Sequence, residues 1–293
     1  MPPSESPTIV DRLSQYSPVI GGAVSFACSD VLTKVALLEG ASVLTGATFR
    51  GFVGLALLFW WRRLTALRPA LSDRERRISL GLGILFAGNV FLLFKSIEAV
   101  DVPIAILTYF VYPLLTGLAG AMTGLDRLTW RGAAAALAAL LGLGLMIGAH
   151  PGALSTFGVM AALAAALCRV VMLLVTRANL QGADPWLTTW YSLISSTALF
   201  ALMCLVTLNW QSPASAYGWV VFVALGFGVT GGILGVYAST ARIGPFRTAL
   251  FMNLEPLLAT IGSAVLLREV ITPLQALGGA VMIAALMVFQ IRK

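Results

Sequence analysis

Apolar residues run along this chain in long stretches, and short groups of polar or turn-forming residues separate them. A helix needs about 20 mostly apolar residues to cross the hydrocarbon core of a bilayer. The loops are too short to hold a soluble domain, so the pattern predicts an all-α membrane protein. We expect ten membrane spans, at about residues 17–38, 42–61, 77–97, 102–123, 131–149, 155–176, 186–208, 217–238, 246–267 and 273–291.

Composition narrows the classes of function. Hydrophobic residues make up 59% of the 293 positions and charged residues only 11%, whereas soluble domains carry about 25% charged residues. Such a chain cannot cover a soluble surface, which argues against a cytosolic enzyme and against a nucleic-acid-binding protein. The three cysteines lie within apolar stretches and lack the spacing of metal ligands, so we expect packing roles for them, with no metal and no cofactor.

Basic residues are distributed unevenly among the predicted loops. With a cytoplasmic N-terminus, 14 arginines and lysines fall in cytoplasmic segments, and the opposite side holds only Arg268 and, near a span end, Lys95. Lys and Arg accumulate on the cytoplasmic side of membrane proteins. We therefore predict that both termini are cytoplasmic, that residues 1–16 form a cytoplasmic tail, and that the protein lies in the cell (inner) membrane.

The chain also resembles itself at an offset of 143 residues. The segment Tyr-Pro-Leu-Leu at 112–115 matches Glu-Pro-Leu-Leu at 255–258. Thirteen residues beyond each proline comes an acid, Asp126 or Glu269, and three residues later comes a threonine that is expected to begin the next helix. This spacing predicts two related halves, and it predicts that the two acids are loop or capping groups.

The number of helices in each half decides how the halves are related. Five spans enter a membrane on one side and leave on the other, so the second half, residues 150–293, is expected to be inverted relative to the first, residues 17–149. Inverted repeats are typical of secondary transporters, which bind substrate near the bilayer midplane between the halves.

Ten spans in a 5+5 repeat, each half ending in a proline and then an acid-x-x-Thr motif, resemble the drug/metabolite transporter superfamily, specifically its EamA-type ten-helix branch. The second half, from Glu255-Pro256 to Thr272-Pro273, is the closer match, and the first half has Asp126 where glutamate is usual. Within the branch, the chain looks most like bacterial exporters of aromatic amino acids. The resemblance implies a transporter that exports small metabolites.

Charged residues within spans are costly, so each needs a partner, water or a function. Asp30 and Lys34 lie four residues apart on one helix face, where they could neutralise each other or take part in transport. Arg50 and Arg169 lie mid-span, either as structural contacts or as groups for a substrate carboxylate. Lys95 is expected to extend to the membrane surface.

Glu255 directly precedes a proline in the ninth predicted span. A proline within a helix leaves the carbonyl four residues earlier without its usual partner. Pro113 and Pro256 would free the carbonyls of Tyr109 and Met252, one in each half. Glu255 and these carbonyls could bind an ammonium group; alternatively, Glu255 is protonated or bonded within the bundle.

Aromatic and small residues complete the predicted centre. Some aromatic rings there could stack on a substrate side chain, although any single ring could equally pack in the core. Asn89 could bond to substrate or to another helix. The rings are Phe86, Phe91, Phe94, Tyr109, Phe110, Tyr112 and Tyr237, and a glycine cluster suited to close helix contact or gating comprises Gly226, Gly228, Gly231, Gly232 and Gly235.

We therefore expect a secondary transporter that exports amino acids, aromatic ones included, or similar small metabolites by alternating access. Its partners would be a small-molecule substrate and the lipid bilayer, and a monomer could hold a complete pathway. The candidate substrate-binding residues are Asn89, Tyr109, Tyr112, Phe86, Glu255, Lys34 and Arg169.

Other functions stay open at this point. A multidrug or cationic-metabolite exporter would use Glu255 as its coupling acid, and a phosphate-ester exchanger would use Lys34, Arg50 and Arg169. A membrane enzyme or lipid-handling scaffold is disfavoured because no catalytic motif is present. Proton antiport and uniport fit the sequence equally well.

Overall fold

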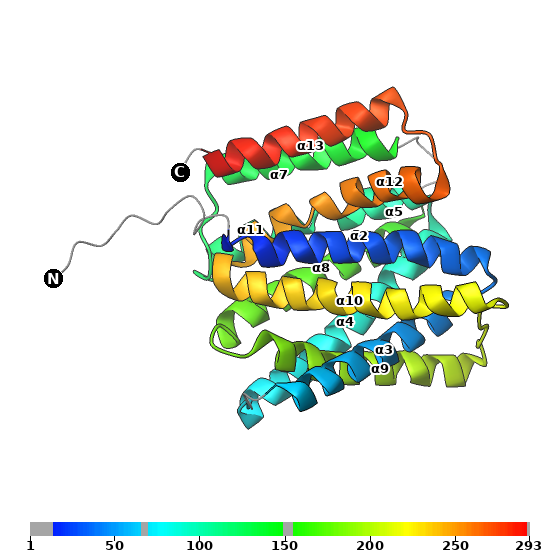
Figure 1. Ribbon diagram of the computed structural model, residues 1–293. Helices are drawn as coiled ribbons and strands as arrows, with labels where there is room; N and C mark the ends of the chain where they lie inside the picture. The colour runs from blue at the N-terminus through cyan, green and yellow to red at the C-terminus, as the bar shows by residue number, and fades with distance from the viewer. Residues whose placement is uncertain (1–13, 66–69, 149–154, 292–293) are drawn as a thin grey trace.

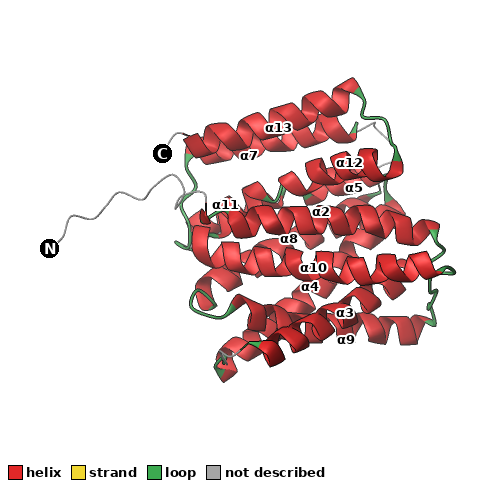
Figure 2. Cartoon of the chain, in the orientation of Figure 1, coloured by secondary structure: helices red, strands yellow, loops and turns green. Residues whose placement is uncertain are grey.

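The computed structural model describes residues 14–65, 70–148 and 155–291, and these segments form helices joined by loops, with no strand among them (Figure 2). The helices are α2 (Ser17–Leu38), α3 (Val43–Leu64), α4 (Asp73–Ala99), α5 (Val102–Tyr109), α6 (Tyr112–Met122), α7 (Trp130–Ile147), α8 (Thr156–Asn179), α9 (Pro185–Thr207), α10 (Ala216–Ile243), α11 (Pro245–Phe251), α12 (Leu254–Leu267) and α13 (Pro273–Ile291).

The helices correspond to the predicted spans. Among the described residues, nine helical segments are long and apolar enough to cross a membrane, with α5–α6 and α11–α12 each counted as one span. The tenth predicted span is α13, whose apolar part covers Pro273–Phe289. The all-α membrane fold is thus confirmed. Which end faces the cytoplasm stays a prediction. The tail and the repeat boundary at 149/150 also stay predictions, because residues 1–13 and 149–154 lie outside the described part.

Side-chain caps decide where several helices begin. Ser72 and Glu75 form a capping box in which each side chain bonds to the backbone N–H of the other residue. This box starts α4 at Asp73, several residues before the apolar stretch that was predicted to begin at 77. The cap satisfies N–H groups that would otherwise lack partners, and it adds a polar first turn that hydropathy alone misses.

Two spans are broken just before their prolines. The helix is interrupted at Phe110 and Val111 between α5 and α6, and again between α11 and α12. The sequence predicted a carbonyl freed by each proline within a continuous span, and for the second half this prediction was wrong. The Met252 carbonyl is not free, because the Glu255 N–H donates to it at 3.0 Å. A tight turn at the break replaces the bond that the proline removes.

Small residues allow two pairs of helices to approach closely. α2 packs along α10, where a Cβ built at Gly235 would lie 2.5 Å from the Pro18 carbonyl oxygen and 2.6 Å from the Gly22 Cα. α7 and α13 lie side by side at one edge of the bundle (Figure 1), where a Cβ at Gly142 would lie 2.7 Å from the Gly278 oxygen. The close contact that the glycines of α10 predicted is confirmed.

The two repeat-related acids lie at opposite ends of the bundle. The Asp126 carboxylate accepts a hydrogen bond from the Phe246 N–H at 3.0 Å, at the start of α11. Glu269 forms an ion pair with Lys34 near the far end of α2. The two halves therefore run in opposite directions, as predicted, and both acids lie in loops.

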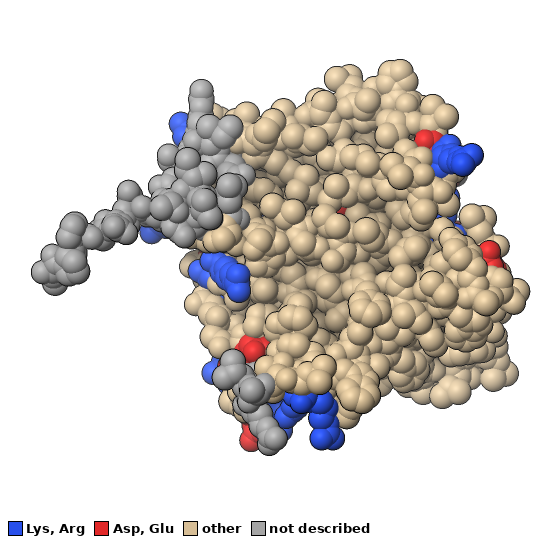
Figure 3. All heavy atoms as spheres, viewed as in Figure 1, with Lys and Arg blue, Asp and Glu red and all other residues tan. Residues whose placement is uncertain are grey.

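One end of the bundle carries most of the charged surface. α2 begins at this end and α13 finishes there (Figure 1). Figure 3 shows arginine and lysine side chains gathered mainly at the same end, whereas the middle of the visible face is almost free of charge. We call it the arginine-rich end; it is the end that the loop charges predict to be cytoplasmic.

Candidate functional site

A cavity of about 170 Å³ lies among seven helices near the middle of the bundle. Its walls combine charged groups with aromatic rings, a composition typical of small-molecule sites. It is lined by Phe26, Ser29, Asp30 and Thr33 of α2, Arg50 of α3, Phe86, Asn89, Val90, Leu93 and Phe94 of α4, Tyr109 of α5, Arg169 of α8, Val229 of α10 and Glu255 of α12.

The cavity wall contains two acidic and two basic residues. Asp30 and Glu255 are acidic, whereas Arg50 and Arg169 are basic. Asp30 interacts electrostatically with Arg50, and Glu255 interacts with Arg169 and with Asp30. No direct ion pair joins any two of these residues in the described chain. Each acid is thus stabilised by an arginine, Asp30 by Arg50 and Glu255 by Arg169, whereas the two acids repel each other.

Asp30 faces the cavity rather than lipid. It lies in the middle of α2 and is surrounded by protein, yet its side chain remains accessible because it lines the cavity wall. Arg50 and Glu255 are both half-buried in the same wall. A polar, accessible space lowers the cost of charges at this depth of a bilayer.

Arg169 is the most deeply enclosed of the four charged residues. Its exposed fraction is 5%, and its Nε atom has no hydrogen-bond partner in the described chain. The guanidinium carbon lies 5.6 Å from the centre of the Phe26 ring and 5.8 Å from that of Tyr112. A buried donor without a partner is costly, so Arg169 is suited to bind an anionic group that enters the cavity.

Asn89 and the predicted aromatics divide into cavity-lining and supporting residues. The Asn89 amide donates to the Ala165 carbonyl oxygen at 2.7 Å, so the interhelical bond predicted as one alternative is present. Phe86, Asn89 and Tyr109 line the cavity. Tyr112 does not; it packs behind Arg169, and its hydroxyl donates to the Ala249 carbonyl oxygen at 3.4 Å.

Lys34 lies away from the other predicted site residues. Its side chain is about half exposed and forms an ion pair with Glu269, and it is absent from the cavity wall. Of the two alternatives left open for Asp30 and Lys34, mutual neutralisation is therefore not what the structure shows. One turn of helix separates the two residues, but Asp30 interacts with Arg50 on α3 whereas Lys34 reaches the loop after α12. A contact between distant segments overrides the local spacing.

Asp30 and Arg50 were considered from the sequence as possible transport groups but were not among the candidate substrate-binding residues. Both lie in the cavity wall with Phe26, Ser29, Thr33 and Phe94. An acid in α2 and an arginine in α3 were the available signal, because each is costly in lipid without a partner. Tyr237 shows the opposite outcome: its hydroxyl is 2.8 Å from that of Ser192, and it lies outside the cavity wall.

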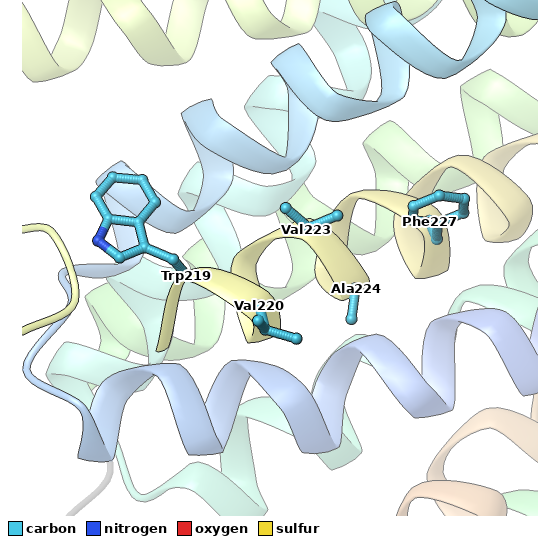
Figure 4. Close-up of a pocket in the computed structure, with 5 residues that line it drawn as sticks. All are labelled: Trp219, Val220, Val223, Ala224 and Phe227. Atoms are coloured by element: carbon cyan, nitrogen blue, oxygen red, sulfur yellow. The ribbon is translucent and has the colours of Figure 1, made fainter. Parts of the chain in front are cut away.

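A larger recess on the outside of α10 differs from this cavity in its volume, in the polarity of its lining and in the number of helices that form it. Its volume is about 630 Å³, and it is lined only by apolar side chains of one helix (Figure 4). The four larger of these are exposed, and the recess contains no charged group. On a membrane-spanning helix such a surface faces acyl chains. The residues are Trp219, Val220, Val223, Ala224 and Phe227.

Comparisons with known proteins agree with the architecture. A crystal structure of a protein superposes with a TM-score of 0.76 at 20% sequence identity, covering 94% of this chain and 96% of the other. At that identity the likeness concerns the fold alone. No curated protein matches the chain. The EamA-like transporter family matches residues 15–148 and 156–290, which correspond to the two halves of the bundle. The chain therefore belongs to the EamA-like transporter family, whose members are membrane transporters of small molecules.

Proposed function

We propose that this protein exports amino acids from the cell, with the central cavity as the substrate site. The observation that carries the proposal is the presence of two acids and two arginines beside aromatic rings in one cavity wall. An amino acid carries one ammonium and one carboxylate group, so it complements such a wall better than a simple cation or anion does. The proposed location is the cell (inner) membrane.

The cavity walls supply a group for each part of an amino acid. Arg169 has an unpartnered Nε atom that suits the carboxylate. Glu255 and Asp30 suit the ammonium group, and the rings of Phe86 and Tyr109 suit the side chain. Asn89 holds α4 against α8 through its bond to Ala165, which fixes the wall that carries these rings.

Cavity size bears on the choice of substrate. A volume of about 170 Å³ is close to the roughly 150 Å³ of an engineered apolar cavity that holds benzene. An amino acid with a small or medium side chain therefore fits as the cavity stands. An aromatic amino acid requires the helices around the cavity to move apart, which alternating access between the two repeats would provide. One chain encloses the whole site, so the functional unit is proposed to be a monomer.

Three related solutes test the proposal directly. Purified protein in liposomes is supplied with labelled leucine, with the amine that lacks its carboxylate, and with the acid that lacks its amino group. We expect flux of leucine and at least about tenfold less of each analogue, because each leaves one buried charge unmatched at a cost of more than about 1.4 kcal/mol.

Two neighbouring phenylalanines of α4 provide a matched pair for the same assay. Phe86 is 5% exposed and lines the cavity, whereas Phe91 is 37% exposed and lies outside it. Phe86→Ala should change the KM for leucine, and Phe91→Ala should not. Absence of flux for every amino acid in a broad panel would rule out the proposal, and flux of the amine alone would favour a cationic-metabolite exporter.

A further inference from the structure

A second polar recess lies at the arginine-rich end, apart from the central cavity. Its volume is about 290 Å³, and it shares no residue with the cavity. Both halves of the chain contribute to it: the α6–α7 loop and the start of α7 from one, and α11 and α13 from the other. It is lined by Asp126, Arg127, Thr129, Trp130, Arg131, Phe246, Arg247 and Phe289.

Three arginines face this recess. Arg127, Arg131 and Arg247 form no ion pair and no side-chain hydrogen bond within the described residues. Arg131 only approaches the Trp130 ring, with its guanidinium carbon 5.7 Å from the ring centre. Guanidinium groups form bidentate hydrogen bonds to phosphate, so three of them around one recess provide a site for a phosphate group.

The single acid in the recess is already engaged. The Asp126 carboxylate accepts hydrogen bonds from the Phe246 N–H at 3.0 Å and from the Arg127 N–H at 2.8 Å. It therefore holds the α6–α7 loop against α11 instead of pairing with a guanidinium group. The recess therefore keeps an excess of positive charge, with three arginines and one acid in its wall.

Apolar groups continue from the recess into the bilayer-facing surface. The Phe246 and Phe289 rings meet edge to face at 5.9 Å between centres. Trp130 at the recess is 76% exposed, and Leu137 and Leu141 further along α7 are 51% and 69% exposed. Tryptophan beside arginine is typical of the membrane–water interface. A ligand with a phosphate group at one end and apolar chains at the other fits this combination.

We propose that the recess binds the phosphate of an anionic phospholipid headgroup, with the acyl chains lying along α7 and α13. Basic pockets at the headgroup level attract anionic lipids, and both helices at this edge present apolar side chains to the membrane, including Leu277 and Val288 of α13, which are 55% and 62% exposed. The site is independent of the substrate cavity and of the identity of the substrate.

The test measures lipid binding to the purified full-length protein. Native mass spectrometry follows the binding of phosphatidylglycerol, of zwitterionic phosphatidylcholine and of inorganic phosphate, each added to protein in neutral detergent. The recess variant combines Arg127→Gln, Arg131→Gln and Arg247→Gln. A matched control, which loses the same charge at the same end, combines Arg62→Gln, Arg63→Gln and Arg242→Gln, none of which lies in the recess.

We expect the unaltered protein and the control to bind phosphatidylglycerol at least about tenfold more tightly than phosphatidylcholine, because the three guanidinium groups of the recess attract the net negative charge of the anionic lipid. The recess variant should lose this preference, and Lys at the same three positions should restore only part of it, because an ammonium group supplies the charge but not the bidentate hydrogen bonds. Equal loss in both triple variants would overturn the proposal, because net charge alone would then explain binding. Inorganic phosphate that displaces the lipid at equal concentration would overturn the lipid assignment.

Discussion

Arg169 and Arg177 lie on the same helix but stand in opposite situations. Arg169 is buried in the cavity wall with an unpartnered Nε atom. Arg177, two turns further along α8, donates from Nη1 to the Ala241 carbonyl oxygen at 2.6 Å and so ties α8 to α10. One residue is arranged to meet a ligand, and the other is arranged to hold the structure.

This difference predicts opposite effects of the same substitution. Arg169→Met should lower amino-acid flux at least about tenfold, because a charge-assisted bond contributes about 1.5–3 kcal/mol, and it should hardly change the melting temperature. Arg177→Met should lower the free energy of unfolding by about 1–3 kcal/mol through loss of its bond and leave KM unchanged. Flux assays and thermal melts of both variants provide the check. If Arg169→Met transports normally, the carboxylate role is wrong.

Side-chain chemistry shows why only part of the site could be foreseen. A glutamate or arginine stands out in an apolar stretch because burying it is costly, so Glu255 and Arg169 were identified from sequence. Which neighbour each charge meets depends on how helices pack. Lys34 reaches Glu269, 235 positions away in the chain, and no local spacing indicates that contact. Tyr112 was included among the candidate site residues for the same reason: the sequence does not show that its ring packs behind Arg169.

At the scale of elements, the α2–α10 contact depends on the absence of side chains. A Cβ at Gly235 would lie 2.5 Å from a backbone oxygen of α2, and backbone cannot move aside cheaply. Gly21, on α2 itself, has nothing within 4 Å of the same position. The two glycines belong to the same helix pair, but only one of them is needed for packing.

Replacing each glycine by alanine separates packing from helix propensity. Gly235→Ala should destabilise the protein by about 1–3 kcal/mol, the usual cost of overpacking. Gly21→Ala should stabilise it by up to about 1 kcal/mol, because alanine favours a helix interior. Measured in the same detergent, the melting temperature should fall for Gly235→Ala and rise for Gly21→Ala. A Gly235→Ala protein as stable as the parent would mean that the two helices can move apart without cost.

The positions of the helices were predictable because hydropathy and prolines act locally. The breaks before Pro113 and Pro256 follow from the missing N–H of proline. The start of α4 does not follow from hydropathy, since the Ser72–Glu75 box extends the helix into polar sequence. The prediction that the Met252 carbonyl lacks a partner was also wrong, because the Glu255 N–H donates a hydrogen bond to it in a tight turn. Hydropathy and proline positions therefore predict where each helix lies, whereas the residues at which it begins and ends depend on the hydrogen bonds available there.

For the whole molecule, the inverted relation of the halves determines where the cavity can lie. Each half contributes charged groups to it: Asp30 and Arg50 from the first, Arg169 and Glu255 from the second. The repeat was visible in the sequence because the proline and the acid recur at fixed spacing. The cavity itself was not, because its walls come from seven helices whose mutual packing no sequence pattern specifies.

The orientation of this assembly in the membrane gives the last prediction. Arg127 lies at the arginine-rich end, and Val270, which is 87% exposed, lies in the loop beyond α12 at the other end. Cysteines introduced singly as Arg127→Cys and Val270→Cys, in a background lacking the native cysteines, should differ in labelling by a membrane-impermeant maleimide. In intact cells only the cysteine at 270 should react, because the distribution of Lys and Arg predicts that the arginine-rich end faces the cytoplasm. The cysteine at 127 should react once the cells are permeabilised. Reaction of both in intact cells would contradict the inverted topology. Reaction of the cysteine at 127 alone would place the arginine-rich end outside the cell and so reverse the predicted orientation.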